Sequence, residues 1–384
     1  MKILRIKVSG LPLYEDVFDV HFLARQRVQE NHLDSVTELA DHIYVNNIEA
    51  FIGINASGKS TALKVISFAG VLLNGLPMNA EYVPNILPEE KTAVFEIDYF
   101  QSSFVYHLRS ELIRKVTSEG AARTVFLSEK IWRKQINSKT NKTNLLDFGG
   151  AEIFRDRENA GDYLPDDVSI MIALNRQNND STAFVDLSLF TNYNFLFRDN
   201  TSVPTEIISL LDPSIESIAV EKIKGKTVTR LKFYGEEPLV LIDQWEISLY
   251  LSSGTIKGIR VFTDAIQVLK NGGYLIVDEI ENHFNYELVA SLLRLFMDKR
   301  TNPNGAVLVF STHYSEILDE LERNDSIFVT RKNKGLRIDN LNLLLKRNDL
   351  KKSEVYQSNL LGGTAPKYSA LMNLKKSIIS DLEA

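Results

Sequence analysis

The sequence predicts an α/β fold: a mixed, mostly parallel sheet flanked by helices, with an antiparallel β lobe and a helical or lid-like insertion. Short, mainly apolar runs lie at Ile48–Ile52, Tyr274–Val277 and 306–310. Runs this short, next to glycines and alternating with helices, are typical of parallel strands covered on both faces. Between 90 and 150 apolar and polar residues alternate instead, as they do in antiparallel strands with one exposed face.

Composition places the chain among globular proteins. Its 384 residues are 44% hydrophobic and 24% charged, which is enough to bury more than one core. A net charge of −6 argues against a protein that coats nucleic acid. The lack of cysteine excludes disulfides, thiolate metal sites and cysteine nucleophiles. There is no apolar run of about 18 residues, and the N-terminus alternates like a strand, so we expect a cytoplasmic protein without a signal peptide.

The N-terminal elements lead into a glycine-rich turn. Apolar residues alternate with polar ones over 4–8 and again over 18–22, which predicts two strands. The apolar strand Ile48–Ile52 then precedes the turn. The helix after the turn places apolar residues on one face and is expected to end near Gly75.

The rest of the chain is divided by changes in period. A helix is expected near 206–211, ended by Pro213, and another over 256–269. No heptad pattern extends over three repeats, so a long coiled coil is not expected. The alternating strands are expected at 95–99, 104–108, 124–127 and around Ile131.

These patterns predict four regions. Residues 1–80 and 240–340 form a split core, and 90–150 an antiparallel lobe. Residues 151–239 form a lid or insertion. The C-terminal extension, 341–384, contains LLGGTAPKYSAL, whose glycines and proline indicate a turn. Two interpretations of the extension stay open: it docks a partner, or it packs on the core.

The motif GINASGKS, residues 53–60, lies between a strand and a helix and matches G-x-x-x-x-G-K-[ST]. In this motif, backbone N–H groups at a helix N-terminus cradle phosphate. Lys59 would neutralise the β- and γ-phosphates, and the Ser60 hydroxyl would bind Mg²⁺. ATP and Mg²⁺ are therefore the predicted cofactors. The predicted cradle consists of Gly53, Asn55, Ala56, Ser57, Gly58, Lys59, Ser60 and Thr61.

The motif YLIVDE, residues 274–279, brings two carboxylates to the C-terminal end of a buried strand, where α/β sheets bind ligands. Asp278 would hold Mg²⁺. Glu279 would position and activate the attacking water, a role worth about 10²- to 10⁴-fold in rate. An apolar strand that ends in Asp-Glu is common by itself, and it gains meaning from the phosphate loop that precedes it.

Two further segments follow the same logic. LSSGTIKG, residues 251–258, precedes an amphipathic helix, and its Ser-Ser-Gly turn predicts a second anion-binding helix N-terminus. In isolation it reads as an ordinary serine-capped helix, but its position ahead of YLIVDE favours phosphate binding. VLVFSTH, 307–313, ends a strand in polar residues. His313 there is either an ordinary structural histidine or a sensor of the γ-phosphate, and the order of the motifs favours the sensor.

The order GINASGKS, LSSGTIKG, YLIVDE and FSTH resembles the ABC ATPase superfamily. DEIENHFN, LSSGT and STHYSEIL are most similar to the small SMC-like ATPases of the AAA_15 and AAA_21 groups. Those groups resemble the ATPase part of OLD-family nucleases and of bacterial anti-phage proteins. The resemblance implies a P-loop ABC-type ATPase core that converts ATP and water to ADP and phosphate.

The resemblance also implies a head-to-tail homodimer, or a higher oligomer, with two ATP molecules between its subunits. The serine that meets the γ-phosphate bound by the partner would be Ser252, and Gly254 would keep its turn open. Ser253 and Thr255 depart from the Gly and Gln usual in the family, which affects the geometry of that contact. Gln177, in ALNRQNND, is the candidate for the family's Mg²⁺-binding glutamine.

The expected role is an ATP-gated sensor or scaffold that controls a separately encoded effector, such as a nuclease or toxin, in anti-phage defence. The chain after His313 is too short for the TOPRIM nuclease domain of OLD proteins. The alternative is a RecF-like DNA-repair ATPase that binds duplex DNA when ATP is bound. A basic segment at 130–142, with Trp132 among its basic residues, is a candidate contact for nucleic acid or, more commonly, a solvated hairpin edge.

Overall fold

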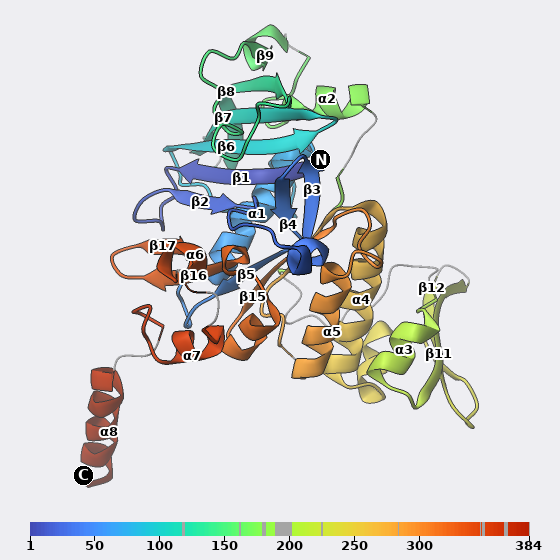
Figure 1. The fold of residues 1–384 in the computed structure, drawn as a ribbon. Helices are drawn as coiled ribbons and strands as arrows, with labels where there is room; N and C mark the ends of the chain where they lie inside the picture. Colours follow the sequence, from blue (N-terminus) through green and yellow to red (C-terminus); the bar gives the residue numbers. More distant parts are fainter. Residues whose placement is uncertain are drawn as a thin grey trace.

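Two six-stranded sheets, one mostly parallel and one antiparallel, form the body of the protein (Figure 1). This computed structural model describes residues 1–116, 120–160, 163–178, 182–188, 202–223, 226–282, 284–345, 347, 350–364 and 368–383. Helices cover both faces of the mostly parallel sheet. The predicted fold class is thereby confirmed.

The mostly parallel sheet carries the strands that lead to the predicted motifs. Its strand order is β10-β14-β15-β5-β16-β17, and every neighbouring pair is parallel except β16 with β17. Every residue of β5, β14 and β15 is buried, which explains why these strands are apolar on both faces except at Glu49, Ser311 and Thr312. The bounds are β5 Ile48–Ile52, β10 Phe184–Asp186, β14 Tyr274–Val277, β15 Val307–Thr312, β16 Ile327–Lys332 and β17 Leu336–Asn340.

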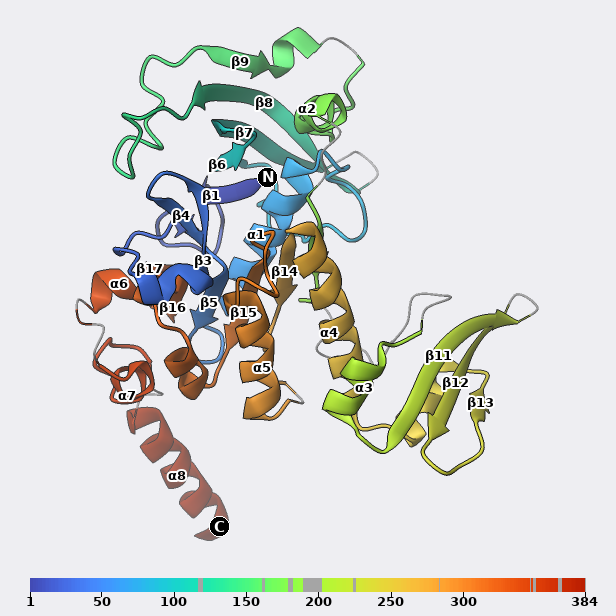
Figure 2. The same cartoon turned by 45° about the vertical axis from the view of Figure 1, so that its right-hand side comes forward.

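Helices pack on opposite faces of this sheet. Helices α4 (Ser253–Asn271) and α5 (Tyr286–Met297) share one core with Leu275 and Val277, whereas α1 (Lys59–Leu73) shares the other core with Tyr274 and Ile276. Successive residues of a strand point to opposite faces, so β14 contributes to both cores. Helix α1 lies between the two sheets (Figures 1 and 2).

The antiparallel sheet extends beyond the predicted lobe on both sides, to β1 and β2 of the predicted core and to β9 of the predicted insertion. Its order is β2-β1-β6-β7-β8-β9, so the N-terminal strands, predicted within 1–80, pair directly with those of 90–150. The short strands predicted at 124–127 and Ile131 are one continuous strand, β8. The bounds are β1 Lys2–Ser9, β2 Phe18–His21, β6 Thr92–Gln101, β7 Phe104–Val116, β8 Ala122–Gln135 and β9 Ile153–Asp156.

The insertion before α4 contains α3 and a three-stranded antiparallel sheet in the order β11-β12-β13. Leu211 of α3 packs against Gly258 of α4, where a Cβ would come within 2.5 Å of the leucine side chain. The insertion therefore packs against α4, the helix that begins within LSSG. The bounds are α3 Thr205–Leu211, β11 Ile215–Ile223, β12 Lys226–Phe233 and β13 Leu239–Leu241, followed by the 3₁₀ helix η4 Gln244–Leu249.

The C-terminal extension is divided in two. The Ser353 N–H, in α7, donates a 3.0 Å hydrogen bond to Asp319 of the core, so this half packs on the core. Helix α8 projects away from the body (Figures 1 and 2). Among the helices of the described segments, none is both long and apolar enough to cross a membrane. The remaining elements are η1 Glu30–Ser35, β3 Val36–Ala40, β4 Ile43–Asn46, η2 Arg157–Ala160, α2 Met171–Asn178, η5 Ser315–Glu320, η6 Asn324–Ser326, α6 Leu341–Leu344, α7 Lys352–Gln357 and α8 Tyr368–Glu383.

Candidate nucleotide-binding site

The glycine-rich loop after β5 has the backbone that a phosphate cradle needs. Gly58, the N-cap of α1, has φ 101°, and no side chain caps this helix. The N–H groups of a first helical turn have no partner within the helix, so they are available to an anion. At Gly53 a Cβ would come within 2.3 Å of the Ser57 hydroxyl, so the loop closes only around a glycine.

Thr330, on β16, supports the loop from behind. Its hydroxyl donates a 3.2 Å hydrogen bond to the Ile52 carbonyl and lies 2.7 Å from the Ser57 hydroxyl. Because the Thr330 hydrogen is used by Ile52, the Ser57 hydroxyl is the donor in the second contact. Ser57 thus stabilises the loop from within, and its side chain is buried.

Lys59 lies at the centre of the cradle. Its Nζ donates to the carbonyls of Gly53 at 3.0 Å and Ile54 at 3.4 Å, and it lies 3.4 Å from Nδ1 of His313. Burial lowers the pKa of Lys59, although the nearby carboxylates of Asp278, Glu281 and Glu279 act in the opposite direction. A bound phosphate would favour the charged form further.

The two carboxylates that follow β14 have different surroundings. Asp278 is buried and accepts a hydrogen bond from the Ser311 hydroxyl, whereas the Glu279 side chain is 43% exposed. Glu279 has φ 46°, in the left-handed region that is uncommon outside glycine. Its N–H donates a 2.8 Å hydrogen bond to the Ser311 hydroxyl. The chain turns sharply here, and Glu279 is directed into the cavity that holds the loop.

His313 and Glu279 meet in that cavity. His313 Nε2 lies 3.7 Å from Glu279 Oε1, and the His313 N–H donates a 2.6 Å hydrogen bond to Glu281. The cavity has a volume of about 400 Å³. The structure therefore brings the predicted cradle, Glu279 and His313 together. Its lining comprises Leu13, Asn55, Ala56, Ser57, Gly58, Lys59, Ser60, Thr61, Glu279, His313, Lys332 and Leu336.

The residues present fit a magnesium ion that is shared with phosphate. In the described part of the chain, no three His, Asp or Glu side chains form a metal cluster. Mg²⁺ is commonly held by one or two carboxylates together with substrate phosphates and water. Ser60 lines the cavity, and the buried Asp278 directly precedes Glu279 in the chain. These two residues would supply the protein ligands.

Gln177 lies elsewhere. It is an exposed residue near the end of α2 and accepts a 3.4 Å hydrogen bond from Arg155. It does not line the cavity of the glycine-rich loop. The structure thus does not bring Gln177 to the other predicted magnesium ligands.

Ser252 is the N-cap of α4. Its Oγ accepts a 3.0 Å hydrogen bond from the Thr255 N–H and lies 2.8 Å from the Thr255 hydroxyl. Ser252 is exposed and Gly254 is half-buried, and neither lines the cavity that Lys59 occupies. Their predicted role toward a phosphate bound by a second subunit stays a prediction.

A family model covers all four motifs. The model described as "AAA domain, putative AbiEii toxin, Type IV TA system" matches residues 49–319. The chain belongs to this family. Membership supports nucleotide binding and hydrolysis of the ATPase type. Among curated proteins, none matches. Among solved structures, the SMC head domain from Thermotoga maritima is 12% identical, with a TM-score of 0.42 over 88% of this chain and 99% of that one.

For this AAA-family chain, four residues of the site had no role in the sequence analysis. Ser311 donates to the Asp278 carboxylate and accepts from the Glu279 N–H, and Glu281 accepts from the His313 N–H. Thr330 supports the loop, and Lys257 of α4 donates to the Glu279 carbonyl. Ser311, Glu281 and Lys257 lie within quoted motifs, so their proximity to the site was visible. Their partners were not, because they depend on how separate strands and helices pack.

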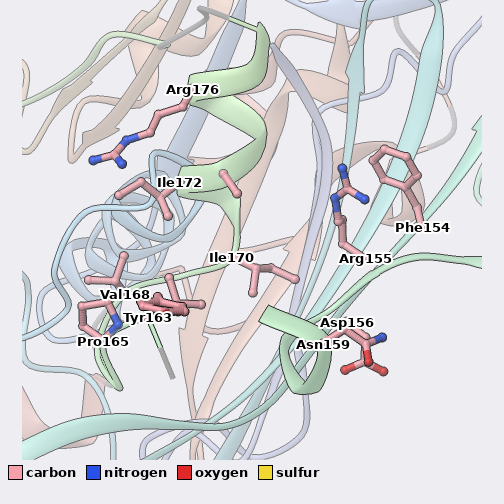
Figure 3. A pocket seen from close by; sticks show the side chains of 12 residues that line it. Phe154, Arg155, Asp156, Asn159, Tyr163, Pro165, Val168, Ile170, Ile172 and Arg176 are labelled. Atoms are coloured by element: carbon pink, nitrogen blue, oxygen red, sulfur yellow. The ribbon is translucent and has the colours of Figure 1, made fainter. Parts of the chain in front are cut away.

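A larger cavity, of about 680 Å³, lies between β9 and α2 (Figure 3). Its walls include Phe154, Ile170 and Ile172, with Arg155 and Arg176 nearby. Its lining has no glycine-rich loop, and the carboxylate that lines it, Asp156 at the end of β9, pairs with Lys130. The smaller cavity beside α1 is therefore the candidate nucleotide site of this AAA-family protein.

The basic segment at 130–142 is largely engaged within the fold. Lys130 pairs with Asp156 at 3.1 Å, and Arg133 lies 3.8 Å from the centre of the Phe154 ring. Lys142 donates to the Ala24 carbonyl at 2.6 Å. These contacts favour a structural role for the segment over contact with nucleic acid.

Proposed function

We propose that the protein is a Mg²⁺-dependent ATPase whose two ATP sites are completed when two copies associate head to tail. One observation carries the proposal. Lys59, Glu279 and His313 converge on the phosphate cradle, whereas the LSSG helix N-terminus at Ser252 faces solvent outside it. The LSSG turn is suited to bind phosphate, but it lies outside the cradle of its own chain. It would therefore meet a phosphate that is bound by another subunit.

The residues of the cradle fit ATP hydrolysis. Mg²⁺, held by Ser60 and Asp278, would neutralise charge on the phosphate oxygens. Lys59 would exchange its contacts with the Gly53 and Ile54 carbonyls for the β- and γ-phosphates. Glu279 would orient the attacking water and accept its proton, a contribution of about 10²- to 10⁴-fold. His313 would contact the γ-phosphate while its ring stays beside Glu279.

Ser252 would complete the site of the other subunit. Its oxygen is fixed by the Thr255 N–H, so the side chain is held at the N-terminus of α4. A helix N-terminus and a hydroxyl together favour a phosphate oxygen. Groups supplied in trans are worth about 10³- to 10⁵-fold when they are arginines, and a serine should contribute less.

We further propose that this ATPase acts in the cytoplasm as an ATP-gated sensor or scaffold for a separate effector, a nuclease or toxin, in anti-phage defence. The family description, which names a putative toxin of a type IV toxin–antitoxin system, supports such a setting. Helix α8, which projects from the body, supports an attachment point (Figure 2). Co-expression with the products of neighbouring reading frames tests this role. The proposed role requires that the ATPase and a neighbouring gene product form a stable complex, and that the activity of this effector change when the ATPase carries Glu279→Gln.

The dimer is tested by measuring molecular mass in solution with and without Mg²⁺-ATP. Native protein should dimerise transiently, and Glu279→Gln should remain a dimer because it binds ATP without turning it over. Lys59→Met is the control that should stay monomeric. Ser252→Ala should bind ATP and hydrolyse it measurably more slowly than the native protein. A Glu279→Gln variant that stays monomeric, or that hydrolyses ATP at the native rate, contradicts the proposal.

A further inference from the structure

Lys257 is a buried lysine on the helix that Ser252 begins. It lies in the second turn of α4, and only 7% of its surface is exposed. Its Nζ donates to the carbonyls of Asn282 at 2.8 Å and Glu279 at 3.3 Å. The ammonium also lies 5.4 Å from the centre of the Phe284 ring. The side chain thus joins α4 to the turn after β14, which contains the predicted catalytic carboxylate.

A buried ammonium is costly for the fold. Burial lowers the pKa of Lys257 to about 8, although Glu281, Glu279 and Asp278 lie near enough to oppose that shift. The neighbours on the same helix, Ile256 and Gly258, are buried without a polar group. An apolar side chain would fill this position at lower cost, so the lysine indicates a use beyond packing.

Three hydrogen bonds hold the Glu279 backbone. Its N–H donates to Ser311 of the neighbouring strand β15, and its carbonyl accepts from the Asn282 N–H at 2.8 Å and from Lys257 of α4 at 3.3 Å. Because Lys257 also donates to the Asn282 carbonyl, it ties both ends of this turn to α4. A left-handed φ in a non-glycine residue persists only where the surroundings impose it. Lys257 and Ser311 therefore hold, from opposite sides, the turn that aims the Glu279 side chain.

We infer that Lys257 is a positioning residue that couples the two ATP sites of the dimer, and this inference rests on the proposed head-to-tail assembly. Helix α4 would present Ser252 to the ATP bound by the partner. Through Lys257 the same helix fixes Glu279, which would act on the ATP bound by its own chain. When Ser252 engages the partner's phosphate, the position of α4 is set, and with it the Glu279 carbonyl. Engagement at one site thereby aligns the carboxylate at the other.

The first test uses Lys257→Met, which keeps the length of the side chain and removes the charge and the donors. ATP-dependent dimerisation and KM should stay within a factor of about two, whereas kcat should fall about 10²-fold, the loss typical of misplacing a reacting group by about 1 Å. Lys257→Arg, which keeps charge and donors, should recover much of kcat. Lys270→Met, at the exposed end of the same helix, is the matched control and should behave as native.

The second test is a double-mutant cycle on kcat with Ser252→Ala, Lys257→Met and both together. If Ser252 acts partly through Lys257, the double variant should lose less kcat than the product of the two single losses. Fully multiplicative effects would overturn the coupling.

If Ser252→Ala has no effect or Glu279→Gln forms no dimer, the proposed function fails. If those two behave as expected but Lys257→Met matches Lys270→Met, only the role of Lys257 fails. Should Lys257→Met not fold, Lys257→Gln, which removes the charge and shortens the side chain but stays polar, takes its place in both tests. A kcat far below native with folding intact then supports the role of Lys257, and a native kcat refutes it.

Discussion

The N–H of Glu279 donates a 2.8 Å hydrogen bond to the hydroxyl of Ser311, on the neighbouring strand. The same hydroxyl donates to Oδ1 of Asp278. One small side chain therefore orients the residue expected to bind Mg²⁺ and the residue expected to act on water. A hydroxyl suits this position because its single oxygen can accept from the backbone and donate to the carboxylate at once.

Ser311→Ala should lower kcat about 10- to 10²-fold with little change in ATP affinity, because outer contacts of this kind tune the groups they orient. Steady-state hydrolysis and ATP titration would be measured together. Ser209→Ala, on the exposed face of α3, is the control. Unchanged turnover in Ser311→Ala would show that Glu279 is held without it.

Lys59→Met should weaken ATP binding by about 10- to 10²-fold, since a hydrogen bond to a charged group contributes about 1.5–3 kcal/mol. Lys59→Arg should also bind weakly, because the wider guanidinium does not fit the two carbonyls of the loop that the ammonium contacts. Calorimetric titration with Mg²⁺-ATP gives both values. Native affinity in Lys59→Met would exclude this cavity as the nucleotide site.

Trp245 offers a direct readout of dimer closure. It lies seven residues before Ser252, is 61% exposed, and is one of only two tryptophans in the chain. In a Trp132→Phe background it is the sole indole. Closure around ATP in the Glu279→Gln form should alter its emission and its quenching by acrylamide. The Lys59→Met form should show neither change. A dimer by mass with unaltered Trp245 fluorescence would place the subunit contact away from this segment.

Glu49 should make stability depend on pH. It is completely buried, and burial together with Asp325 raises its pKa well above its usual value near 4.5. In the unfolded chain the group loses its proton near pH 4.5, so the stability of the native protein should fall as pH rises from there. Thermal unfolding between pH 5 and 8 measures this slope. Glu49→Gln, which mimics the protonated form, should flatten it. Glu236→Gln, at an exposed site, should leave it unchanged.

The sequence predicted best those elements whose environment is uniform. Strands β5 and β14 have the predicted ends because a strand covered on both faces is apolar at nearly every position; Glu49 is the one exception in these two strands. The phosphate loop was equally predictable from the sequence, since its glycines are required by the local backbone conformation. The pairing of β1 with β6 was not, because about 90 residues separate the partners and register depends on the assembled sheet.

Contacts across elements also lay beyond the sequence. Nothing local to Lys257 indicates that its ammonium reaches the Glu279 carbonyl, 22 positions away. Gln177 was the candidate for the family's Mg²⁺-binding glutamine, but helix α2 packs with the antiparallel sheet, and Gln177 does not line the cavity of the loop. Periodicity in the sequence assigns a residue to a helix or strand, but it does not determine which other elements pack against that helix or strand.

The burial of α1 between the two sheets has a consequence for folding. Twelve of its 15 residues are buried, so the helix has no face that water could solvate. Neither sheet can therefore expose it without a large loss of apolar contact. We expect both sheets to unfold in a single cooperative transition, and an excised fragment that carries α1 with only one of them to aggregate.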